Sequence, residues 1–133
     1  MFDFLTAVVA IALVGTTTAK TLYLRSSGES SGDPESRLTT YTVYAETTSP
    51  GSDNRYVFTL KKLSGGYRCY IDRTPSYRNR STSFHMTHRL SDDRGEYICF
   101  TADLPYIAQA RTLCKTWSDL TQRYIETGQT FES

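Results

Sequence analysis

The sequence of 133 residues contains only two histidines, three cysteines and one tryptophan. It has no GxSxG segment, no Walker A loop and no glycine-rich dinucleotide motif, so the usual sequence evidence for those enzyme classes is missing. No CxxC pair occurs, which argues against a zinc knuckle. No third ligand is spaced to join the histidines in a metal site. We therefore expect neither a metal nor another cofactor.

The cysteines are too few, and odd in number, for a disulfide framework. Cys69 and Cys99 lie in the short apolar-aromatic runs YRCYI and EYICF, and Cys114 lies on the apolar side of a helical pattern. We predict that all three are free thiols that pack as small hydrophobes. The alternative is a disulfide or a metal role.

The chain also lacks an excess of charge of one sign. Its formal net charge is +1, so any electrostatic argument for binding must be local. Hydrophobic residues make up 38% of the chain, and ten tyrosines and six phenylalanines raise the aromatic share to 13%. We therefore expect one domain whose core is built largely from aromatic rings.

No apolar run is long enough for a typical membrane-spanning helix. The longest, residues 4–14, is interrupted only by Thr6 and has the length of a signal-peptide core. Asp3 and the absence of Lys or Arg before this run are atypical of exported chains. We predict an apolar leader over residues 1–20, either signal peptide or membrane anchor, which favours a membrane-associated or exported protein over a cytoplasmic one. A buried strand or helix is the alternative.

The next segment, residues 21–37, contains SSGESSGDPES and is predicted to be a linker, because its Ser, Gly, Pro and acidic residues have little to bury. Residues 38–133 form the predicted domain. Apolar residues alternate with polar ones over 39–47, 55–63 and 67–72, which predicts antiparallel strands joined by turns. Residues 84–90 and 96–101 are further short candidates, and we expect a meander of about four strands.

A long helix is predicted to end the domain. Asp103 can cap its first turn, where Pro105 is tolerated, and Gly128 is the expected stop, which gives about 24 residues. Its apolar stripe has spacings of three and four. The members of this stripe are Ile107, Ala110, Cys114, Trp117, Thr121 and Tyr124. The fold class is therefore α+β, with Trp117 as a core anchor or, alternatively, a residue of a partner groove.

Residues 67–131 resemble a set of small proteins from mobile elements and phages of Gram-positive bacteria. The resemblance rests on HMTHRL, on the strand GEYICF, and on the helix WSDLTQRYIETG. It implies a compact domain of bacterial or phage origin and carries no catalytic assignment.

The segment from Arg73 to Ser91 contains four arginines and no acidic residue. Guanidinium groups match phosphate oxygens in bidentate geometry, and interleaved aromatic rings can stack on bases. We therefore predict a patch that binds a nucleic acid, another phosphate-rich ligand or an acidic protein partner. Its residues are Arg73, Arg78, Arg80, His85 and Arg89. The alternative is an exposed loop whose charges pair with Asp72, Asp92 and Asp93.

Both histidines lie in this segment, three residues apart. Two imidazoles beside an arginine can supply the acid and base of a metal-independent phosphodiesterase or ribonuclease. His85, His88 and Arg89 are the residues of that catalytic alternative, whereas the simpler interpretation is a structural His88 and an exposed His85. We favour a non-enzymatic accessory protein of a mobile genetic element. A membrane-tethered or secreted structural subunit is a further alternative.

Overall fold

The computed structural model describes residues 38–100 and 104–132. The predicted leader and linker, and the predicted cap Asp103, lie outside the described residues. Among the described helices, none combines the length and the apolar character that crossing a membrane requires. The elements follow the order β1 (Leu38–Tyr44), β2 (Arg55–Leu63), β3 (Gly66–Arg73), α2 (Phe84–Thr87), β4 (Arg89–Ser91), β5 (Glu96–Ile98) and α3 (Ile107–Thr127).

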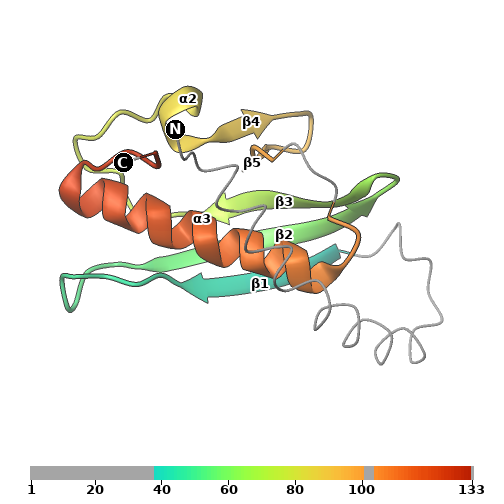
Figure 1. Cartoon of the computed structure of the whole chain (residues 1–133), viewed down its shortest axis with the longest axis horizontal. Helices are drawn as coiled ribbons and strands as arrows, with labels where there is room; N and C mark the ends of the chain where they lie inside the picture. The colour runs from blue at the N-terminus through green and yellow to red at the C-terminus, as the bar shows by residue number, and fades with distance from the viewer. Residues whose placement is uncertain (1–37, 101–103, 133) are drawn as a thin grey trace.

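The strands form one antiparallel sheet in the order β1-β2-β3-β5-β4, and α3 lies across one of its faces (Figure 1). The predicted α+β class is confirmed, with five strands where about four were expected. Alternation sends Tyr56, Phe58 and Leu60 of β2 into the core, where none of them is exposed. Gly66 begins β3 at a φ of 134°, where a Cβ would lie 2.8 Å from the backbone nitrogen of Leu104.

The prediction of a single strand over residues 84–90 was wrong, because local hydrogen bonds form a helical turn first. The Ser83 hydroxyl accepts from the backbone N–H of Met86, 3.3 Å away, and so caps α2. His88 then ends α2 in the left-handed conformation, at a φ of 52°. Within this segment only β4 is extended, and Phe84 and Leu90 are 41% and 44% exposed.

Helix α3 has 21 residues, fewer than the 24 expected, because it begins after Tyr106. The Tyr106 N–H donates to Oε1 of Gln109, 3.2 Å away, which satisfies a free donor of the first turn. Gly128 ends the helix at a φ of 82°, as predicted. The predicted stripe faces the sheet: all its members are buried except Ile107, which packs against the core partly buried.

The core lies between α3 and β1, β2 and β3. Trp117 is fully buried at its centre, with its indole edge-on to the rings of Tyr56 and Phe58 at centroid distances of 6.0 Å. Its role as a core anchor is confirmed. All three cysteines are free, as predicted; Cys69 and Cys114 are buried, whereas Cys99 is half-buried.

Candidate functional site

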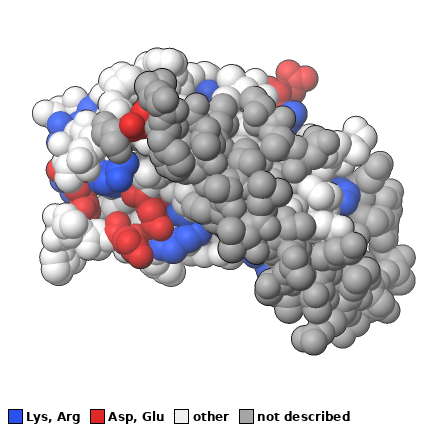
Figure 2. Space-filling model, viewed as in Figure 1, with Lys and Arg blue, Asp and Glu red and all other residues white. Residues whose placement is uncertain are grey.

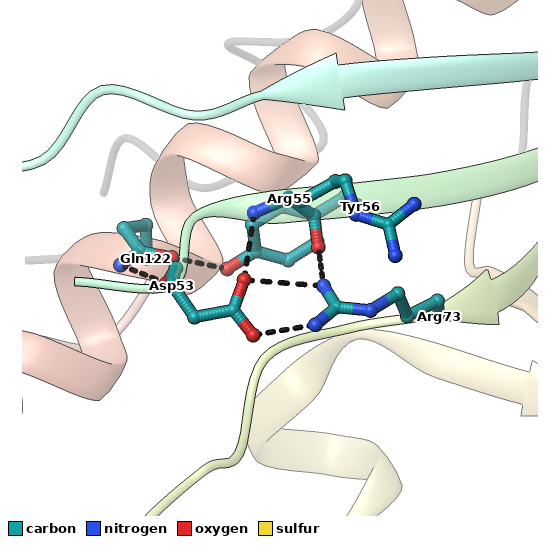
Figure 3. Close-up of polar contacts among 5 residues, drawn as sticks. All are labelled: Asp53, Arg55, Tyr56, Arg73 and Gln122. Atoms are coloured by element: carbon teal, nitrogen blue, oxygen red, sulfur yellow. Dashed lines mark hydrogen bonds and ion pairs between the residues drawn. The ribbon is translucent and has the colours of Figure 1, made fainter. Parts of the chain in front are cut away.

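Arg73, at the end of β3, is held by Asp53 from the β1–β2 connection (Figure 3). Its Nη2 lies 2.6 Å from Asp53 Oδ2 and its Nη1 lies 3.2 Å from Oδ1. Nη1 also donates to the backbone carbonyl of Arg55. The hydrogen bonds from Arg73 and from the Arg55 N–H lower the pKa of Asp53. Arg73 therefore ties the end of β3 to the start of β2, and its charge is balanced by the Asp53 carboxylate.

The same connection is fixed from the helix side by Gln122 (Figure 3). The buried Gln122 amide accepts from the Tyr56 hydroxyl, 2.9 Å away, and donates to the backbone carbonyl of Asp53, 3.1 Å away. Burial raises the pKa of Tyr56, so its hydroxyl stays a donor. The contacts of Arg73 thus belong to a network that joins α3 to the sheet.

Arg80 is bound at the end of α3. Its Nε donates to the carbonyl oxygen of Ile125, 3.2 Å away, one of the carbonyls left without a helical partner. Its guanidinium also packs on Gly128, where an added Cβ would come within 2.9 Å of Nη1. A cation at a helix C-terminus is favoured by the helix dipole. Arg80 therefore serves as a cap for α3.

Arg89 is the most enclosed of the predicted binding residues, at 9% exposure. Its Nε donates to the Thr87 hydroxyl at 2.7 Å, its Nη2 donates to the carbonyl of Thr82 at 2.6 Å, and its Nη1 pairs with Glu96. The guanidinium also lies 5.1 Å from the centre of the Phe84 ring. The Arg89 guanidinium is therefore bound by other residues of the domain and has a structural role.

The two histidines have different surroundings. His85 is exposed on α2. His88 stacks on Phe131 of the C-terminal segment at a centroid distance of 4.8 Å, and its Nε2 lies 2.8 Å from Oε1 of Glu132. The residues of the catalytic alternative therefore share no open face, since His88 is engaged with the C-terminal segment and Arg89 is buried.

Arg78 completes the predicted patch. It is exposed and adopts a φ of 58°, and its backbone N–H donates to the Ser76 hydroxyl at 3.1 Å. Arg73, Arg80 and Arg89 are thus bound within the fold, and Arg78 and His85 are the exposed members. The carboxylates that hold Arg73 and Arg89 are Asp53 and Glu96, neither of which was among the expected partners.

Sequence reasoning missed a second group of basic and aromatic side chains, on the face of the sheet opposite α3. We call it the open-face cluster; its members are Lys61, Arg68, Tyr70, Arg94 and Tyr97. Tyr70 and Tyr97 are opposite each other on β3 and β5, with ring centroids 5.8 Å apart. The Arg68 guanidinium lies 4.2 Å from the centre of the Tyr97 ring, and that of Arg94 lies 5.3 Å from the centre of the Tyr70 ring.

Asp92 organises this cluster. Its Oδ2 accepts from the Tyr70 hydroxyl at 2.6 Å and from Nη1 of Arg68 at 2.8 Å. The hydrogen bond from the Tyr70 hydroxyl lowers the pKa of Asp92 to about 2, and the hydrogen bonds from the Arg94 N–H and from Arg68 act in the same direction. Desolvation of the carboxylate opposes this shift but is outweighed. The carboxylate is therefore charged over the physiological range, and it holds the Arg68 guanidinium above the Tyr97 ring.

The guanidinium groups form the outer layer of the cluster. Tyr70 is buried, Tyr97 is half-buried, and the Arg68 side chain is 35% exposed. Lys61 lies directly opposite Arg68 on β2. Beside the stack is a hollow of about 300 Å³, which is bordered by Arg68, Tyr97 and Leu90 and extends past the turn between β2 and β3 to core residues such as Ile98 and Leu113. This face therefore offers flat cationic surfaces next to a recess.

The opposite face of the sheet carries α3. Where its side chains are described, acidic and basic groups are interspersed (Figure 2). Among the described residues, no three His, Cys, Asp or Glu side chains gather in a way that would hold a metal ion. The open-face cluster is therefore the site with the clearest binding chemistry. Comparisons with protein-family models, curated proteins and solved structures found no match for this chain.

Proposed function

We propose that this chain is a non-enzymatic binding protein that holds a single-stranded nucleic acid on the open-face cluster. The observation that carries the proposal is the Arg68 guanidinium, which lies 4.2 Å above the Tyr97 ring and is fixed there by Asp92. Proteins bind unpaired bases by stacking them on aromatic rings or on guanidinium planes. A guanidinium with an aromatic ring beneath it and solvent above it can receive a base on its free side.

Charge supports the same ligand. Lys61, Arg68 and Arg94 lie on this face and outnumber the two carboxylates Asp72 and Asp92 by one, so a phosphate backbone that crosses the sheet meets a small positive excess. The excess is modest, and stacking must therefore supply much of the affinity. If all three cations meet phosphates, the logarithm of the binding constant falls with the logarithm of salt with a slope of roughly −2.

The hollow next to Tyr97 gives the surface a preference for unpaired bases. A base turned out of a flexible strand can enter a recess bordered by Arg68 and Leu90, whereas a base inside a duplex stays stacked on its neighbours. An accessory role in a mobile genetic element, which we favour from the sequence, is compatible with a binder that leaves its ligand intact.

Fluorescence anisotropy with a labelled 12-nucleotide strand tests the proposal. We expect Tyr97→Leu, which removes the ring but keeps an apolar side chain, to weaken binding roughly tenfold to hundredfold. Tyr97→Phe, which retains the ring, is the matched control and should bind like the parent. Gel analysis should show an intact strand after incubation.

Three outcomes would contradict the proposal. Equal affinity for the matching duplex would indicate binding by charge alone, and equal affinity for polyglutamate would indicate an acidic protein partner. Loss of binding in Arg78→Ala, with Tyr97→Leu unaffected, would place the site on the exposed loop that contains Arg78 instead of on the sheet.

A further inference from the structure

Cys69 and Cys114 are two buried thiols that meet between β3 and α3. Cys69 is 1% exposed and Cys114 is fully buried. The Cys69 thiol is one of the groups that raise the pKa of the Cys114 thiol, so the two side chains are neighbours. Cys69 Sγ also lies 3.6 Å from the carbonyl oxygen of Ala110, one helical turn before Cys114. The Cys69 side chain is therefore directed at the turn of α3 that carries Cys114.

The neighbouring residue allows this close approach. Ala110 is fully buried, and its small side chain lets the helix backbone come near β3. A disulfide requires two nearby cysteines whose side chains point toward each other, a condition that most cysteine pairs in a fold do not meet. Here the Cys69 thiol, on β3, lies against the backbone of the helical turn that carries Cys114, which is distant in sequence.

We propose that Cys69 and Cys114 form a disulfide that fixes α3 to β3 when the chain folds in an oxidising environment. With oxidised glutathione as the oxidant, the thiolate of one cysteine attacks the glutathione disulfide and releases one glutathione. The second cysteine displaces the other glutathione from the mixed disulfide. The two protein thiols lose two electrons and two protons, and one oxidised glutathione becomes two reduced glutathione molecules.

The burial of the two thiols determines when the disulfide can form. Burial, together with the neighbouring Cys69 thiol, raises the pKa of the Cys114 thiol, so the reactive thiolate is scarce in the folded chain. Oxidation therefore proceeds during folding, before the helix covers the sheet, and is slow afterwards. The redox state of the pair then reflects the environment in which the chain folded.

The experiment is to refold the full chain from denaturant in a glutathione redox buffer, alkylate the remaining thiols and digest with trypsin. Cleavage after arginine and lysine places Cys69 in residues 69–73, Cys114 in residues 112–115 and Cys99 in residues 95–111, so each cysteine has its own peptide. We expect peptides 69–73 and 112–115 to be joined. A Cys99→Ala variant is the control and should give the same joined pair.

The cross-link closes a long loop, so we expect the oxidised chain to melt roughly 10 °C or more above the reduced chain. Addition of dithiothreitol should return the melting temperature to that of the reduced chain. Alkylated Cys69 and Cys114 after oxidative refolding would overturn the proposal. A joined pair that includes Cys99, or a melting temperature that dithiothreitol leaves unchanged, would also overturn it. The peptide analysis uses the parent chain, so its result does not depend on whether a variant folds.

Discussion

The indole Nε1 of Trp117 donates to the backbone carbonyl of Thr87 at 3.0 Å. This bond joins the centre of α3 to the last residue of α2 and satisfies a carbonyl at a helix end. Thr87 is itself fully buried, and Arg89 donates to its hydroxyl. The core tryptophan therefore positions the segment that leads into β4.

Replacing this tryptophan tests that role. Trp117→Phe keeps an aromatic ring but removes the donor to Thr87 and leaves a cavity. We expect a loss of about 2–4 kcal/mol in the free energy of unfolding, measured by urea denaturation. Leu90→Ala, at an exposed position, is the control and should change stability by less than about 0.5 kcal/mol. Equal effects of the two substitutions would contradict the assignment.

Arg89 should behave as a structural residue. Arg89→Met removes a buried side chain that donates three hydrogen bonds, and it should cost about 2–4 kcal/mol of stability. Glu96→Gln should cost less, because the Glu96 side chain is 41% exposed whereas that of Arg89 is 10% exposed. Arg78→Ala is the exposed arginine control. Wild-type stability in Arg89→Met would contradict the structural role and would support the ligand-binding role that was predicted from the sequence.

Stability in acid should depend on Glu126. Burial would raise the pKa of this carboxyl, but hydrogen bonds from Thr47, Gln122 and the backbone N–H at position 48 lower it to about 2, below its ordinary value of 4.5. Because the folded state prefers the carboxylate, its contribution is complete above pH 4.5 and is lost as the pH falls to about 2.

Glu126→Gln should therefore show a shallower loss of stability between pH 5 and pH 2 than the parent chain. Thermal unfolding followed by circular dichroism across this range measures the difference. Asp53 and Asp92 also have lowered pKa values, so some acid sensitivity should persist in the variant. A parent and a variant with parallel profiles would show that Glu126 contributes nothing to the acid transition.

The fold could be predicted from the sequence because its elements obey simple periods. Tyr56, Phe58 and Leu60 alternate with residues on the opposite face, and Gly128 stands where the helical pattern ends. Residues 84–90 were predicted wrongly because the Ser83 cap competes with the extended conformation over one turn. Such local competition leaves little trace in the spacing of apolar residues.

The candidate site was harder to predict, because its contacts join residues that are distant in sequence. Arg73 finds its carboxylate at Asp53, twenty residues earlier, and this position lay outside the segment chosen for its lack of acidic residues. Arg68 and Tyr97 meet only because β5 is placed beside β3 in the sheet. The alternation of β3 does place Arg68 and Tyr70 on the face away from the core, which was the available signal.

The most direct measurement of the proposed function is a titration of the ¹⁵N-labelled chain with an unlabelled single strand of 12 nucleotides, followed by two-dimensional NMR. The account predicts that the largest amide shifts fall on β3 and β5 around Arg68, Tyr70 and Tyr97. Shifts that are absent at low salt, or that cluster at Arg78 and His85 while β3 and β5 stay unchanged, would contradict it.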